Sequence, residues 1–220
     1  MIVELQMKDR TIEENEKDFP RWEKETSSKI EELESKVKEI TEELAKKEED
    51  LQALKKLLDQ RESELNRLRD EYINRGVACV KKGKYDQAIF DFTTALEISP
   101  KDHKAYNNRG NAYLQKRQYD QAISDFTKAL EINPWDDKAW YNRGVTYWEK
   151  DQYGQAISDF TKVLEINPKD SETYYNRGIN YYLKREYDKS WEDVKKAQDL
   201  GYKIPAEFLE DLRKVSGRQN

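Results

Sequence analysis

Hydrophobic residues in the N-terminal third of the chain alternate at spacings of three and four. From residue 21 to residue 75 there is no proline and no glycine, so one continuous helix is possible. The alternation places the apolar side chains on one seam, which is typical of a left-handed coiled coil. The predicted oligomerisation seam consists of Ile30, Leu33, Val37, Ile40, Leu44, Leu51, Leu54, Leu58, Leu65 and Leu68.

Two polar residues, Lys47 and Arg61, occupy seam positions. In a parallel dimer with aligned chains each would face its own copy, which costs stability and could favour an antiparallel or staggered pair. The pattern predicts a self-associating coiled coil. A solvated single helix, and a helix that packs back on the rest of the chain, remain the alternatives. The seam runs without interruption to Tyr72, so the helix should be continuous with the structure that follows.

Beyond residue 68 the pattern repeats with a period of 34 residues. The tripeptide Asn-Arg-Gly occurs four times, with its glycine at Gly76, Gly110, Gly144 and Gly178. A tyrosine follows nine residues after each glycine, and an apolar stretch then leads in three units to Pro100, Pro134 and Pro168. Because proline lacks an amide donor and restricts the residue before it, each unit is predicted to be a helix, a turn, a second helix and a stop.

The recurring glycines lie inside helical patterns, where glycine costs about 1 kcal/mol relative to alanine. Their recurrence indicates a close approach of two helix backbones, with Ala88, Ala122 and Ala156 as the expected small partners on the second helix. A phenylalanine lies four residues after each of these alanines, on the same helix face, where it can fill the space between hairpins. These are Phe92, Phe126 and Phe160.

This combination of period and residue types closely resembles the tetratricopeptide repeat. The resemblance rests on the aromatics Tyr72, Tyr106, Trp140 and Tyr174, the glycine four residues on, and the tyrosines, alanines, phenylalanines and prolines that follow. One departure is an arginine, at Arg75, Arg109, Arg143 and Arg177, where the family commonly has leucine before the glycine. Its spacing from Asp91, Asp125, Asp159 and Asp193 favours an internal ion-pair ladder over an anion site.

The resemblance implies an all-α fold, a right-handed α-α superhelix of four helical hairpins over 69–102, 103–136, 137–170 and 171–204. The fourth unit departs from the pattern, as terminal repeats usually do. Pro205 can open a further helix, so 205–220 is predicted to be a capping helix and tail. Residues 21–68 form the predicted coiled-coil helix. Residues 1–20, which end at Pro20, are expected to be a poorly defined N-terminal segment.

Charge and composition narrow the function classes. Residues 1–68 carry 14 Lys/Arg against 20 Asp/Glu and residues 69–220 carry 26 against 25, so neither part has the basic excess of most nucleic-acid binders. The start of the chain lacks the apolar core of a secretory signal, and no window approaches the roughly 18 apolar residues of a membrane span. With Cys79 as the single cysteine, we expect a soluble cytoplasmic protein without disulfides.

Catalytic chemistry is nearly absent from the sequence. His103, the single histidine, follows Lys101-Asp102 in a turn and is expected to be a solvated turn residue. Cys79 takes the place that Tyr113, Tyr147 and Tyr181 hold in the other units and is expected to fill the core. One Cys and one His supply neither a nucleophile-base pair nor a zinc site. The sequence therefore predicts no enzyme, no metal and no cofactor.

The resemblance implies a concave groove lined by the first helix of each hairpin. An asparagine ladder can donate to and accept from a ligand, and exposed aromatics supply anchoring area. Alternatively, the asparagines bond between adjacent first helices and the aromatics pack locally. The predicted groove residues are Asn74, Asn107, Asn108, Asn111, Tyr141, Asn142, Val145, Trp148, Tyr175, Asn176, Ile179 and Tyr182.

These features favour a protein-interaction scaffold that binds a protein or peptide in the groove and oligomerises through the coiled coil. The alternatives are a regulatory or chaperone-like subunit whose N-terminal helix pairs with a different protein and, as a minor possibility, RNA binding through the tyrosines. The carboxylate-clamp repeats that grip chaperone tails have a lysine, an asparagine and an arginine at positions where this chain has Ile73, Val77 and Asn142, respectively. Chaperone-tail binding is disfavoured.

Overall fold

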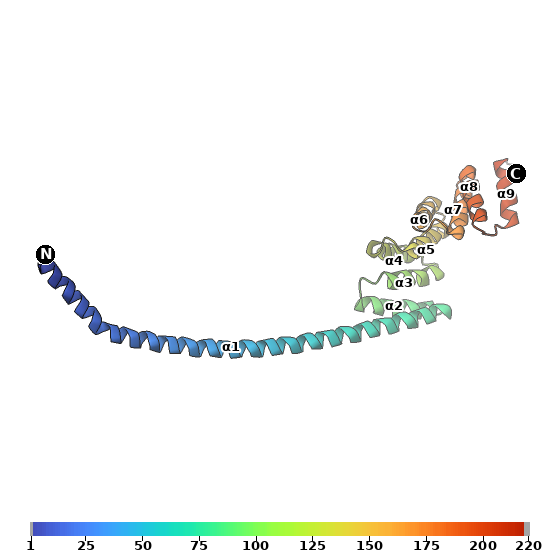
Figure 1. The fold of residues 1–220 in the computed structure, drawn as a ribbon. Coiled ribbons are helices and arrows are strands. Elements are labelled where there is room, and N and C mark those ends of the chain that lie inside the picture. Colours follow the sequence, from blue (N-terminus) through green and yellow to red (C-terminus); the bar gives the residue numbers. More distant parts are fainter. Residues whose placement is uncertain (1, 218–220) are drawn as a thin grey trace. The chain divides into compact units, whose positions relative to one another are not determined.

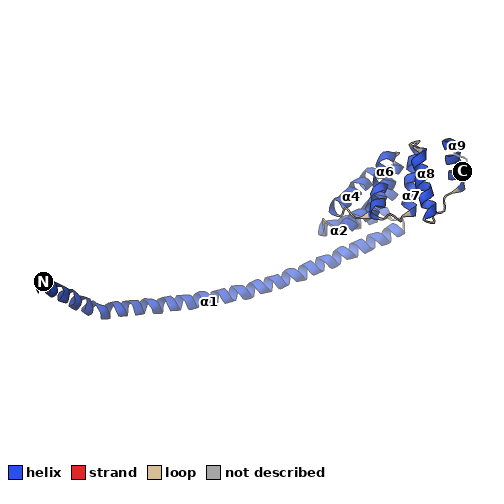
Figure 2. Cartoon of the chain, turned by 45° about the horizontal axis from the view of Figure 1, so that its top comes forward, coloured by secondary structure: helices blue, strands red, loops and turns tan. Residues whose placement is uncertain are grey.

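The structure is a computed structural model that describes the backbone of residues 2–217 and the side chains of residues 21–217. Within that range it contains nine α-helices and no strand (Figures 1 and 2). Backbone contacts divide the chain into two units, residues 1–62 and residues 63–220. None of the described helices is long and apolar enough to cross a membrane.

The first unit is the N-terminal part of helix α1, which spans Ile2–Lys81. Side chains from residue 27 to residue 68 are exposed, including those of the predicted seam. The helical backbone continues through Pro20. Because the side chains of residues 1–20 lie outside the described ones, the proposed segment boundary at Pro20 stays a prediction.

The second unit is a stack of helical hairpins, as the period of 34 residues predicts. The end of α1 pairs with α2, and each later first helix pairs with the second helix that follows it, so that consecutive hairpins pack in sequence (Figure 1). The helices are α2 (Tyr85–Ile98), α3 (His103–Gln115), α4 (Tyr119–Ile132), α5 (Asp137–Glu149), α6 (Tyr153–Ile166), α7 (Ser171–Leu183), α8 (Tyr187–Asp199) and α9 (Ala206–Ser216).

Helix starts and turns are fixed by short-range chemistry. Asp102, Asp136 and Asp170 cap α3, α5 and α7: Asp102 accepts hydrogen bonds from two backbone N–H groups of the first turn, and Asp136 and Asp170 accept one each. The turn inside each hairpin needs one residue with positive φ. The first hairpin places Gly83 there, and the others place Arg117, Asp151 and Arg185.

The recurring glycines make room for an aromatic ring. An added Cβ would lie 2.6 Å from Phe92 Cε1 at Gly76, 2.8 Å from Phe126 Cε1 at Gly110 and 2.9 Å from Phe160 Cε1 at Gly144. The predicted close approach of two helices is therefore present, but the side chain that demands glycine is the buried phenylalanine rather than an alanine. In the fourth hairpin Val194 takes the place of phenylalanine, and its Cγ2 would be 3.3 Å from a Cβ at Gly178.

The arginine column forms the predicted internal ladder. In each hairpin the arginine of the first helix donates two hydrogen bonds to the aspartate of the second helix, as from Arg143 Nε and Nη2 to Asp159 at 2.7 and 2.9 Å. The Nη1 group of Arg143 also donates to Thr127 Oγ1 of the preceding hairpin at 3.0 Å. One guanidinium thus connects three helices, and the same pattern recurs at Arg109 and Arg177.

Helix α9 closes the C-terminal end of the stack, as predicted. Its Leu212 is fully buried, and Ser216 Oγ accepts a hydrogen bond from Trp191 Nε1 of α8 at 2.9 Å. Cys79 of α1 packs at the edge of the core cluster around Ala88 and Phe92, in agreement with its predicted role as a core filler.

The Gly110→Ala substitution should lower the free energy of unfolding by about 1–3 kcal/mol, because the new methyl group overlaps the Phe126 ring. The matched control is Gly154→Ala in α6, where a Cβ meets nothing within 4 Å. This change should instead stabilise the protein by about 0.4–1 kcal/mol. Urea unfolding followed by circular dichroism measures both. Equal effects of the two substitutions would contradict the packing account.

Candidate functional site

Two neighbouring cavities lie along the first helices of the second, third and fourth hairpins. They share Tyr141 of α5 and Glu172 of α7, and therefore form one continuous groove segment. The first cavity, about 230 Å³, is lined by Tyr141, Val145, Trp148, Phe160, Glu172, Asn176, Ile179 and Asn180. The second, about 460 Å³, is lined by Asn107, Asn108, Asn111, Asp137, Lys138, Tyr141, Asn142, Val163, Asp170 and Glu172.

Tyr141 is held in place between the two cavities. Its hydroxyl donates a hydrogen bond to Glu172 Oε1 at 2.8 Å and accepts one from Asn176 Nδ2 at 2.8 Å. Its ring centroid lies 5.7 Å from that of the buried Phe160. Burial, together with the hydrogen bond to Glu172, raises the pKa of the Tyr141 phenol well above its usual value. Tyr141 is therefore a neutral, oriented wall of the groove.

The asparagine ladder bridges neighbouring first helices. Asn142 Nδ2 of α5 donates to Asn107 Oδ1 of α3 at 3.1 Å, and Asn176 of α7 bonds to Tyr141 of α5. Asn142 and Asn176 therefore follow the alternative stated above, in which the asparagines form hydrogen bonds between adjacent first helices. Asn108 and Asn111 line the larger cavity, where their amides can meet a ligand.

Two predicted groove aromatics contact the C-terminal segment instead. The Tyr175 ring stacks on Tyr202 at 4.9 Å between centroids and meets Phe208 of α9 edge-on at 5.8 Å. The Tyr182 ring lies 5.3 Å from the same Phe208 ring. Burial, with Tyr202 beside it, raises the pKa of the Tyr175 phenol. Both tyrosines therefore serve the packing of the cap.

The predicted groove residues thus fall into three groups. Tyr141, Val145, Trp148, Asn176 and Ile179 line the smaller cavity, and Asn107, Asn108, Asn111 and Asn142 line the larger. The remaining three, Asn74, Tyr175 and Tyr182, line neither. Whether any of these residues binds a partner stays a prediction.

Several lining residues were missed by the sequence reasoning, above all Glu172 and Asn180. Both are departures from the repeat, which could have revealed them. Glu172 stands where the second and third units carry Lys104 and Lys138. Asn180 is buried, with 1% of its surface exposed, at a position that carries Ala78, Ala112 and Thr146 in the other units.

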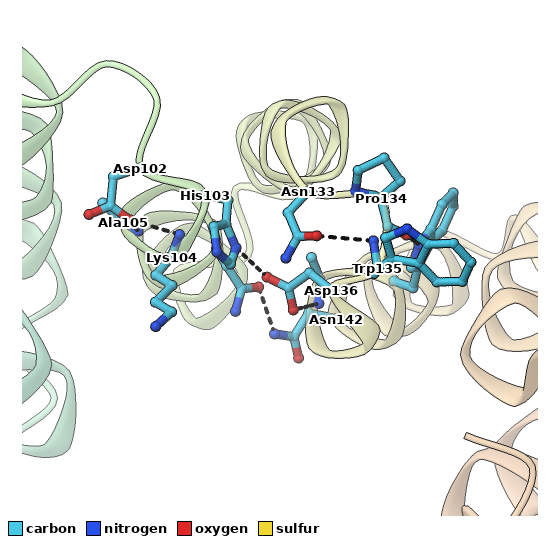
Figure 3. A network of polar contacts seen from close by, with 12 residues as sticks. Asp102, His103, Lys104, Ala105, Asn133, Pro134, Trp135, Asp136 and Asn142 are labelled. Atoms are coloured by element: carbon cyan, nitrogen blue, oxygen red, sulfur yellow. Dashed lines mark hydrogen bonds and ion pairs between the residues drawn. The ribbon is translucent and has the colours of Figure 1, made fainter. Parts of the chain in front are cut away.

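The single histidine has a structural partner. His103 Nδ1 lies 2.9 Å from Asp136 Oδ2, and the other oxygen of the same carboxylate caps α5 (Figure 3). The histidine side chain is 26% exposed. The expectation of a solvated turn residue was therefore wrong, because the stacking of the next hairpin brings Asp136 against His103. In the part of the chain with described side chains, no cluster of three or more His, Cys, Asp or Glu could hold a metal ion.

Comparison with protein-family models identifies tetratricopeptide repeats. One model, described as tetratricopeptide repeat, matches residues 103–136 and 137–170, which are the second and third predicted units. Another, described as TPR repeat, matches residues 76–117. A comparison with curated proteins finds no significant match.

Solved structures share the fold. The MamA RS-1 ArsTM double mutant is 22% identical with a TM-score of 0.63, over 70% of this chain and 85% of that one. The Arabidopsis OM64 TPR domain is 26% identical with a TM-score of 0.50, over 51% and 93%. The first TPR of Spaghetti (RPAP3), bound to the HSP90 peptide SRMEEVD, is 24% identical with a TM-score of 0.51, over 56% and 94%.

The Tyr141→Phe variant should be less stable than the parent by about 1–2 kcal/mol near neutral pH, because Glu172 and Asn176 lose their shared partner. The raised pKa means that the parent's extra stability is present below about pH 10 and is lost as pH rises toward the pKa of the folded state. Urea unfolding should therefore show a smaller difference in the free energy of unfolding between the parent and the variant at pH 11 than at pH 8. A difference in the free energy of unfolding that is the same at both pH values would contradict this account.

Proposed function

The chain is a tetratricopeptide-repeat protein, and on this premise we propose that it is a non-enzymatic interaction scaffold. In this proposal a protein or peptide partner binds the groove segment around Tyr141, and the coiled-coil seam joins several copies of the chain. The observation that carries the proposal is the pair of cavities that share Tyr141 and Glu172.

The groove segment has the chemistry of a peptide-binding surface. Apolar anchoring area comes from Trp148, Val145 and Ile179, and the asparagines of the larger cavity can bond to a ligand backbone. Trp148 is 39% exposed although it lies at the wall of a cavity, so its ring is available to a partner. Aromatic residues in such positions carry a large share of the binding energy at protein interfaces.

The seam supports the multivalent part of the proposal. Its apolar side chains extend over residues 30–68, and each is between 42% and 62% exposed in the single chain. Water contact along so long an apolar stripe is unfavourable, and pairing with a second helix would remove it. Joining copies in this way would let weak contacts at each groove act together with high avidity.

The HSP90 peptide in the Spaghetti (RPAP3) complex is acidic at its C-terminal end. The groove segment here offers one cation, Lys138, beside Asp137, Asp170 and Glu172. Its charge is therefore opposite to what an acidic tail requires. We therefore do not propose chaperone-tail binding for this chain.

A second candidate function has the seam pair with a different protein. Lys47 and Arg61 on the seam favour it, because a partner helix with acidic residues at the facing positions would match them better than a second copy would. The chain would then be a regulatory subunit of a mixed complex. Co-purification of a stoichiometric heteromer with no self-association would select this alternative.

Capture of partners from a cell extract should depend on Trp148 and not on Trp135, a 77% exposed tryptophan in the loop before α5. The immobilised Trp148→Ala variant should lose the bound partner, because its ring forms a wall of the smaller cavity. The Trp135→Ala control removes an equal side chain outside both cavities. Mass spectrometry compares the captured proteins, and equal capture by both variants would overturn groove binding.

Self-association should be sensitive to Leu58→Glu and much less to Leu57→Glu. These adjacent leucines are similarly exposed, 61% and 53%, but Leu58 is a seam residue and Leu57 is not. A charge at a seam position is buried without a partner in the assembled state, which shifts the equilibrium to single chains. Light scattering at micromolar concentration measures the mass. A parent protein that is already monomeric would contradict the proposal.

A further inference from the structure

Asn180, which lines the smaller cavity, carries a buried hydrogen-bond acceptor without a donor. Asn180 Nδ2 donates to the backbone carbonyl of Asn176 at 2.8 Å, while Asn180 Oδ1 has no partner among the described residues. The amide orientation is fixed, because the reversed orientation would place two oxygens against each other. A buried oxygen without a hydrogen bond is costly. Because this oxygen is covered in the structure, a donor from a ligand in the cavity reaches it when the covering side chains shift.

The charged side chains that line the two cavities mostly have one sign. Glu172 lines both cavities, and Asp137 and Asp170 line the larger one, while Lys138 is the one cation among the lining residues of the two. The groove segment therefore carries a net charge of about −2 from these four side chains. Its potential attracts a cationic segment and repels an acidic one.

The other walls of the smaller cavity suit the aliphatic part of a long side chain from a ligand. Val145 and Ile179 supply apolar surface, and the exposed Trp148 offers a ring that a cation can approach. The volume of about 230 Å³ exceeds the roughly 150 Å³ of a cavity that holds benzene, so one long side chain fits. Lysine and arginine combine an apolar stem with a head that only donates hydrogen bonds.

We infer that the groove segment recognises a basic segment of a protein partner, with one lysine or arginine side chain anchored in the smaller cavity. The stem lies against Val145 and Ile179, and the cationic head donates to Asn180 Oδ1 and faces Glu172. This inference rests on the proposed function of the groove and specifies which partner it accepts. An RNA ligand is not favoured, because the lining acids repel phosphates.

The test selects peptides on the intact protein from a displayed library of random short peptides. The selected peptides should contain lysine or arginine, and replacing that residue by glutamine should weaken binding about tenfold or more, measured by fluorescence anisotropy. Binding should also weaken as the salt concentration rises.

Variants of the protein locate the anchor. Glu172→Gln and Asn180→Thr should each weaken binding of the basic peptide about tenfold. Asn180→Thr preserves the fold because Thr146, at the equivalent position, bonds to the carbonyl of Asn142 in the same way. The matched control is Glu131→Gln, an exposed acid of α4 outside both cavities, which should leave affinity unchanged. Glu172→Lys should reverse the preference toward peptides in which the basic residue is replaced by glutamate.

The outcomes separate the inference from the proposed function. Selected peptides that lack a basic anchor but still lose affinity with Trp148→Ala would overturn the inference and leave the groove as a binding site. Basic peptides whose affinity is the same with Glu172→Gln as with Glu131→Gln would also overturn the inference. Peptides that bind equally well to the parent and to Trp148→Ala would contradict both.

Discussion

Four arginine–aspartate pairs, one in each hairpin, hold the first helix against the second. The aspartates are buried, so each depends on its arginine for compensation. In the second, third and fourth hairpins the planar guanidinium also donates to a threonine of the preceding hairpin. A lysine could not make this set of bonds. The same interaction thus closes each hairpin and sets the stacking of hairpins on which the groove depends.

The groove is built from departures from that regular framework. Repeated residues set the spacing of the helices: the glycine at Gly144 recurs in all four hairpins and the phenylalanine at Phe160 in three. Glu172 and Asn180, which give the groove part of its chemistry, differ from their counterparts in all the other hairpins, and Tyr141 recurs only as Tyr175 of the fourth. Repetition therefore supplies a rigid support, and single substitutions on it supply a site with its own shape and charge.

The helices at the two ends of the repeat stack differ in the exposure of their apolar side chains. At the C-terminal end, α9 covers the last hairpin with Leu212 and Phe208. The rings of Tyr175 and Tyr182 pack against Phe208. At the N-terminal end, the first helix of the first hairpin is the last part of α1, whose earlier residues carry an exposed apolar seam. The C-terminal helix thus buries its apolar face within the chain, whereas the apolar side chains of the seam in α1 are exposed.

The amino-acid pattern was enough to predict the hairpins, their boundaries near His103, Asp137 and Ser171, the arginine–aspartate ladder and the apolar seam. Local chemistry and strict periodicity specify these features. Which of the predicted groove side chains line a cavity became clear from the packed fold alone. The pairing of His103 with Asp136, the cover over Tyr175 and the unpartnered Asn180 Oδ1 all depend on contacts between residues far apart in the sequence. A repeat period fixes how helices recur, but not which neighbour each side chain meets.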